Sequence, residues 1–172
     1  MMKNLFKASA IALMIAASGM SVAQAEPVNI NVTGNVVASP CVVNNSKTSY
    51  DVDLGQTIQA ADLATAGAAT TPVAFDLTMA SCPSGTKKVI VTFTGTADAD
   101  QTTMFKNTGT ATPLAVELSS GGTVLSNNGT LTKDVAADKT VTYNLSARAV
   151  TATGSVMPGT IVSVIQANFT YN

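Results

Sequence analysis

The chain contains no histidine, so its carboxylates are the first candidates for acid–base chemistry. Without histidine, neither a Ser-His-Asp triad nor a Cys-His pair can be built for nucleophilic catalysis. Asp98 and Asp100 could form the carboxylate pair of a glycoside hydrolase, but their polar loop is more typical of solvated charges. The two glutamates, Glu26 and Glu117, lie far apart in the sequence. The sequence therefore predicts that the protein is not an enzyme.

Candidate metal ligands are equally sparse. Asp98-Ala99-Asp100 resembles half of a calcium-binding loop, but the glycine and the distant glutamate of such a loop are missing. A zinc site would need more ligands than Cys41 and Cys82 supply. We therefore expect neither a metal ion nor another cofactor.

Residues 1–25 have the composition of a secretory signal peptide. Lys3 and Lys7 give a positive start, an apolar run from Ala8 to Ala17 follows, and Ala23-Gln24-Ala25 supplies the small residues before a cleavage site. The apolar run is about ten residues, well short of the roughly 20 that span a bilayer. We expect cleavage before Glu26, with a retained membrane anchor as the alternative.

Cys41 and Cys82 predict one structural disulfide. An even number of cysteines in an exported chain indicates pairing, whereas a redox-active pair is more often spaced Cys-x-x-Cys. The bridge would close a loop of about 40 residues and stabilise the fold by about 3–4 kcal/mol on the chain-entropy estimate.

The charge balance argues against a nucleic-acid partner. The chain has nine basic and ten acidic residues, and two of the basic ones, Lys3 and Lys7, belong to the predicted leader. A mildly acidic surface without a basic stripe is not typical of nucleic-acid binding. The chain also lacks tryptophan, which weakens a sugar-binding interpretation because lectin sites often stack rings on aromatic faces. No small-molecule substrate is predicted.

Alternation of apolar and polar residues predicts a single all-β domain, an antiparallel sandwich. Turn signals separate the strands, as at Asn127-Asn128-Gly129 and at Pro158-Gly159, where we expect the last strand to open. Residues 59–68 are the one stretch with a hint of a helical turn. The expected strands cover residues 28–32, 73–79, 89–93, 114–118, 141–145 and 161–171.

The predicted N-terminal extension, residues 26–37, looks like an extended arm. Val28, Ile30 and Val32 lie on one face, and Gly34 continues that phase without a side chain, which lets two backbones approach closely. The pattern alone leaves two alternatives: the arm pairs within its own domain, or it pairs with another chain.

The expected last strand has two unlike phases. One holds Ile161, Ile165, Ala167, Phe169 and Tyr171, and the other holds Val162 and Val164 before it turns polar. We expect this strand to be buried on both faces near its start and on one face near its end. We also expect it to be the last strand of the domain.

The order and spacing of several motifs resemble the pilin family of the chaperone–usher pathway, especially the minor tip subunits of type 1 fimbriae. The resemblance covers essentially all of the chain after the leader. The matching motifs are the Gly-x-Val-Val-x-x-x-Cys run from Gly34 to Cys41, Val52-Asp53-Leu54-Gly55, Ser81-Cys82-Pro83, the Asn-x-Gly-Thr run from Asn107 to Thr110, Gly159 at the fourteenth position from the C-terminus, and the penultimate Tyr171.

This resemblance implies an incomplete immunoglobulin-like sandwich, residues 38–172, that lacks its final strand and is completed by a donated one. A periplasmic chaperone would first lend a strand and anchor the C-terminal carboxylate of Asn172. At the outer-membrane usher, the arm of a neighbouring subunit would replace that strand. The implied donor residues are Val28, Ile30, Val32 and Gly34, and the implied groove residues are Gly159, Ile161, Ile165, Ala167, Phe169, Tyr171 and Asn172.

The expected role is that of a structural subunit of a surface fimbria involved in cell adhesion, exported through the periplasm. A tip adhesin would need a receptor-binding domain ahead of the pilin domain, and Cys41 follows the predicted cleavage site too closely for one. The short arm favours a minor tip adaptor over a major rod subunit, because rod pilins tend to have longer arms. A secreted β-sandwich binding protein is the remaining alternative.

Overall fold

The computed structural model describes residues 29–36, 40–43, 46–47 and 49–172. The predicted signal peptide and Val28 lie outside this described part. The chain divides into two units, Met1–Asn35 and Val36–Asn172. Within the first unit, residues 29–35 form neither helix nor strand, and the same holds for Val36 at the start of the second. Among the described residues, no helix has the length and apolar content needed to cross a membrane.

The second unit is built from β-strands, as the alternation predicts. Its elements are β1 (Val42–Val43), the 3₁₀ turn η2 (Ala60–Leu63), β2 (Val73–Ala80), β3 (Lys88–Gly95), β4 (Phe105–Lys106), β5 (Ala115–Ser120), β6 (Thr123–Val124), β7 (Gly129–Asp134), β8 (Val141–Val150) and β9 (Ile165–Tyr171). The hint of a helical turn in residues 59–68 is confirmed by η2.

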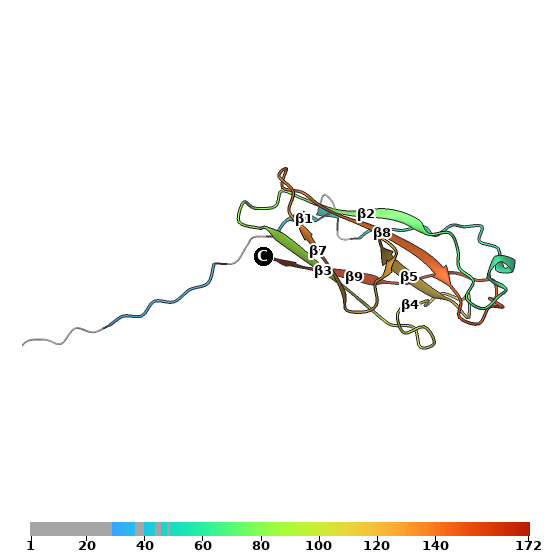
Figure 1. Cartoon of the computed structure of the whole chain (residues 1–172). Coiled ribbons are helices and arrows are strands. Elements are labelled where there is room, and N and C mark those ends of the chain that lie inside the picture. The colour runs from blue at the N-terminus through green and yellow to red at the C-terminus, as the bar shows by residue number, and fades with distance from the viewer. Residues whose placement is uncertain (1–28, 37–39, 44–45, 48) are drawn as a thin grey trace, which may run out of the picture. The chain divides into compact units, whose positions relative to one another are not determined.

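The strands form two antiparallel sheets that pack face to face (Figure 1). One sheet has the order β1–β2–β8–β5–β4, with β6 beside β5, and the other has the order β7–β3–β9. In the second sheet β9 pairs with β3 along its whole length, from Val89 opposite Tyr171 to Gly95 opposite Ile165. No described strand pairs with the other edge of β9.

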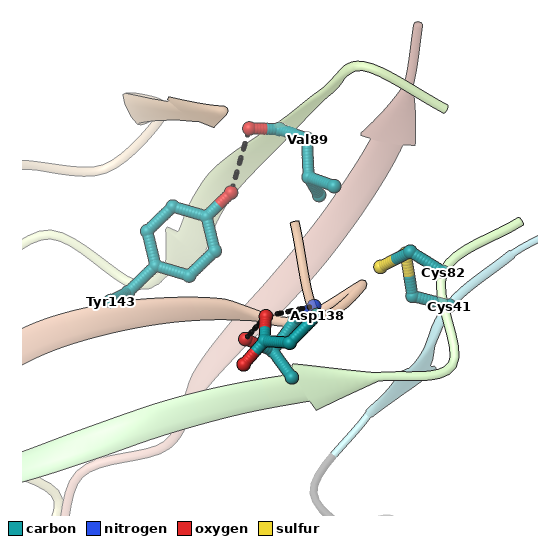
Figure 2. Close-up of a disulfide and its surroundings, with 6 residues drawn as sticks. Cys41, Cys82, Val89, Asp138 and Tyr143 are labelled. Carbon is teal, nitrogen blue, oxygen red and sulfur yellow. Dashed lines mark hydrogen bonds between the residues drawn. A yellow bond between two sulfur atoms is a disulfide. The ribbon is translucent and has the colours of Figure 1, made fainter. Parts of the chain in front are cut away.

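The core lies between the two sheets because each central strand points alternate side chains inward. The inward residues include Leu77 and Met79 on β2, Val89, Val91 and Phe93 on β3, and Val141, Tyr143 and Leu145 on β8. The Tyr143 hydroxyl donates a hydrogen bond to the Val89 carbonyl oxygen at 2.7 Å and so ties the sheets together (Figure 2). Burial, and secondarily the charge of the nearby Tyr171, raise the pKa of Tyr143 to about 12.

Two expectations for the last strand are wrong. The strand begins at Ile165 rather than at Gly159, because the preceding residues bond to an irregular segment instead of a neighbouring strand. Val162 and Val164 are exposed rather than buried, at 49% and 72%, so the start of this segment is covered on one face only.

Cys41 and Cys82 form the predicted disulfide, with the sulfur atoms 2.11 Å apart (Figure 2). The bridge ties the end of β2 to the chain just ahead of β1. Among the described residues two pairs join β1 to β2, and the disulfide adds a covalent restraint beside this short edge strand.

Candidate functional site

A long apolar groove of about 830 Å³ opens between two segments that are far apart in the sequence and do not pair with each other. One wall is residues 50–58, except Thr57, and the other is formed by residues 159–163 with Ile165 and Ala167 from β9. The floor is the core itself, formed by Phe75 and Leu77 of β2, Phe93 of β3, Val116 and Leu118 of β5, and Leu145 and Ala147 of β8. The arrangement leaves the sandwich open along one edge of β9.

The first wall is anchored by contacts with the second, smaller core and with β2. Val52 and Leu54 point inward and are half-buried, while their neighbours Asp51 and Asp53 are exposed. Leu54 and Ile58 pack against a cluster formed by Leu63, Ala111, Leu114, Ala149 and Val156. Tyr50 stacks near Phe75, with ring centroids 5.6 Å apart, and fixes the wall against β2.

The second wall is positioned by Asn107, which is only 7% exposed. Its Oδ1 accepts hydrogen bonds from the Val162 N–H at 2.8 Å and the Gly109 N–H at 2.9 Å. Its Nδ2 donates to the Ala111 carbonyl oxygen at 2.7 Å. One buried amide therefore fixes the loop after β4 and the groove wall together, which gives the Asn107-x-Gly-Thr motif a structural role.

Gly159 packs against the same loop. A Cβ at this position would collide with the backbone nitrogen of Ala111 and would lie 2.6 Å from the Thr110 carbonyl carbon. The glycine therefore allows the wall to approach the loop as closely as backbone sterics permit.

Gly159→Ala is expected to destabilise the fold by about 1–3 kcal/mol, because two backbone segments must move apart. Gly85→Ala is the matched control, since nothing lies within 4 Å of its added Cβ. Urea unfolding of both variants measures the difference. Equal free energies of unfolding would contradict the close approach at Gly159.

The structure divides the seven predicted groove residues into three groups. Gly159, Ile161, Ile165 and Ala167 line the groove. Phe169 and Tyr171 are half-buried and pack against the main core, as Ile165 and Ala167 also do, but they do not line the groove. Burial raises the pKa of Tyr171, while a hydrogen bond with the Cys41 backbone acts in the opposite direction.

Asn172, the last of the seven, is tied to the start of β3. Its backbone oxygen accepts hydrogen bonds from the Lys87 N–H at 2.6 Å and the Lys88 N–H at 3.0 Å. Its own N–H donates to the Lys88 carbonyl oxygen at 3.0 Å. The C-terminal end of β9 is thus fully paired on the β3 side (Figure 1).

The described part of the predicted donor arm presents its apolar side chains to solvent. Ile30 is 85% exposed and Val32 is 89% exposed, and nothing lies within 4 Å of a Cβ built on Gly34. Three apolar positions of the same phase, Ile30, Val32 and Val36, are thus exposed in the part of the chain that the structure describes.

Sequence reasoning missed the wall at residues 50–58 and the floor from β5 and β8. The alternation of Val52 and Leu54 with Asp51 and Asp53 is the signal that could have identified the wall as an extended segment.

Two of the carboxylates considered for catalysis, Asp98 and Glu117, form hydrogen bonds that stabilise the fold. Asp98 Oδ1 accepts hydrogen bonds from the N–H groups of Asp100 and Gln101, both at 3.0 Å, and so closes its own loop. Glu117 receives two hydrogen bonds of 2.9 Å from Arg148 on the neighbouring strand. Within the described ranges no group of three or more acidic or cysteine residues could hold a metal ion.

The chain is similar in sequence to known fimbrial proteins. The model of the family described as fimbrial protein matches residues 30–172. The chain is 40% identical to Protein FimG of Escherichia coli over 87% of both chains. It is 37% identical to the S-fimbrial adhesin protein SfaS of Escherichia coli, over 87% of this chain and 88% of that protein.

A solved structure of a chaperone–usher pilus shares the fold. It matches with a TM-score of 0.62 over 86% of this chain and 96% of that chain, at 19% sequence identity. The two chains therefore share the immunoglobulin-like sandwich of pilus subunits.

Proposed function

Because the chain belongs to the fimbrial protein family and is a structural subunit of a surface pilus, we propose that it is assembled by donor-strand exchange. The observation that carries the proposal is the apolar groove of about 830 Å³ beside the unpaired edge of β9. An extended strand laid in the groove would pair its backbone with that edge and bury alternate side chains on the floor.

The arm supplies the complementary half of the mechanism. Val28, Ile30 and Val32 occur at every second position, which matches the two-residue period of a strand with one buried face. Each such side chain buried in a neighbour's groove would stabilise the pair by about 1.5–3 kcal/mol. Gly34 would let the donor backbone approach where a side chain would not fit.

The division of the chain follows from these roles. Residues 1–25 would be removed on export, residues 26–37 would act as the donor strand, and residues 38–172 would form the receiving domain. The domain would be an immunoglobulin-like sandwich without its final strand, and the donated strand of a neighbour would complete it.

An uncovered groove is an aggregation hazard, so a partner must cover it before assembly. We infer that a periplasmic chaperone lends a strand first, near Asn172, and that exchange for a subunit's arm follows at the outer-membrane usher. The short arm supports a place as a minor tip adaptor rather than as a rod subunit.

Addition of a strand peptide tests the receiving half of this mechanism. A synthetic peptide of residues 27–37 should raise the thermal unfolding midpoint of the chain starting at Glu26, because a ligand at 100 times its Kd stabilises by about 2.7 kcal/mol. A control peptide with Ile30→Ser and Val32→Ser should have little effect. A monomeric, cooperatively folding chain that ignores every peptide of this pattern would rule out strand exchange.

A further inference from the structure

We propose that Lys133 blocks strand addition at β7, the second free edge of the smaller sheet, and so confines strand addition on that sheet to β9. The inference rests on the proposed strand exchange and adds what keeps that exchange on one side of the sandwich. The partner that Lys133 excludes is the β7 edge of a second copy of this chain.

The smaller sheet has two free edges, because its strand order is β7–β3–β9. Among the described residues, no backbone hydrogen bond reaches residues 130–134 of β7 from any segment other than β3. A row of unpaired N–H and C=O groups is a template for pairing with another strand. Because every copy of the chain carries the same edge, two copies could pair β7 to β7 as a closed dimer.

Lys133 lies on the face of β7 that points into the sandwich. It stands opposite the fully buried Val89 of β3, and Leu131 stands opposite the fully buried Val91. Residues directly opposite each other in an antiparallel pair share one face of the sheet. Leu131 and Val135, two residues away on either side of Lys133, pack against the main core. The inward face of this edge strand therefore carries a lysine between two apolar residues.

The side chain of Lys133 is exposed in spite of its inward position. A lysine on the inner face of an edge strand keeps its ammonium hydrated by extending past the free edge. Among the described residues, Lys133 forms no ion pair. A strand added at β7 would close the route to water and cover an unpaired charge with apolar neighbours. The cost of removing that charge from water opposes the backbone hydrogen bonds that the added strand would form.

The β9 edge of the same sheet carries no such charge. Its inward residues all pack against the main core and are Ile165, Ala167, Phe169 and Tyr171. The whole segment 159–172 contains no charged side chain. A strand laid along β9 therefore buries no charge of that strand, whereas a strand laid along β7 buries the ammonium of Lys133. This difference directs strand addition to β9.

Self-association with the β9 groove filled tests this role of Lys133. The chain starting at Glu26 is saturated with the synthetic peptide of residues 27–37, and dimer formation is followed by sedimentation velocity over a range of chain concentrations. Lys133→Val should lower the midpoint concentration for dimer formation at least about tenfold, because dimerisation no longer buries a charge. In the dimer, the amides of residues 130–134 should gain protection from hydrogen exchange.

Thr132→Val is the matched control, because it places the same valine on the same strand but on the outward face, opposite Ile90. This control should dimerise no more than the original chain. Lys133→Glu keeps a charge at the inward position and should also stay monomeric. Lys133→Thr removes the charge with a residue that favours strands, so it should dimerise as Lys133→Val does and provides the test if the valine variant fails to fold.

Monomeric Lys133→Val and Lys133→Thr chains, or equal dimerisation of Lys133→Val and Thr132→Val, would overturn the role of Lys133 and leave strand exchange intact. Dimers whose new protection lies outside residues 130–134 would do the same. Failure of the peptide to bind would overturn strand exchange instead. The variants are then compared as bare chains, and the same shift in midpoint decides whether Lys133 blocks the β7 edge.

Discussion

Deletion of residues 26–33 is expected to abolish incorporation of the chain into the pilus while leaving its domain folded. Ile30 and Val32 of this arm are 85% and 89% exposed, so we expect their removal to leave the free energy of unfolding of the free chain nearly unchanged. In a neighbour's groove the same side chains, together with Val28, would each contribute about 1.5–3 kcal/mol. The loss therefore appears only in the assembled fibre.

Co-expression with the chaperone and usher of its own pilus, followed by immunogold labelling of the fibres, measures incorporation. Chaperone binding should be unchanged, because the receiving groove lies in residues 50–58 and 159–167 and not in the arm. Fibres that still contain the deleted chain would show that the arm is not the donor.

Point variants separate the two faces of the arm. Ile30→Ser combined with Val32→Ser should reduce incorporation strongly, because the proposed strand exchange would bury both side chains in a neighbour's groove. Asn29→Ser combined with Asn31→Ser changes the other face by the same number of residues and should leave incorporation near its original level. Equal effects of the two pairs would contradict the assignment of faces.

Replacement of both Cys41 and Cys82 by alanine is expected to lower the free energy of unfolding by about 4 kcal/mol. The bridge spans a sequence separation of 41 residues, and a loop of that length gives this value in the chain-entropy estimate. We expect β1 to be affected most, because two described residue pairs are all that the structure shows between it and β2.

Urea unfolding measures the change, and reduction provides an internal control. A reducing agent should bring the original chain to the stability of the double variant and should not change the variant further. A double variant within about 1 kcal/mol of the oxidised chain would show that the sheets, rather than the bridge, hold this edge.

The local pattern of the sequence determined the all-β class and the positions of the central strands. β2, β3 and β8 begin within one residue of the predicted starts, because each has a regular alternation of polar and apolar residues that faces a core on one side. The disulfide followed from the number of cysteines and the export signal. The strands β4 and β6, two residues each, are too short to leave such a pattern.

The tertiary structure alone decided the shape of the groove. Its two walls are about 100 residues apart in the sequence, and one is positioned by the buried amide of Asn107, which bonds to Val162. Val162 and Val164 look like buried strand residues in the sequence, yet they are exposed because the segment before β9 bonds to a loop and has no layer above it. Alternation reports which side chains share a face, but burial of that face depends on which remote segment covers it.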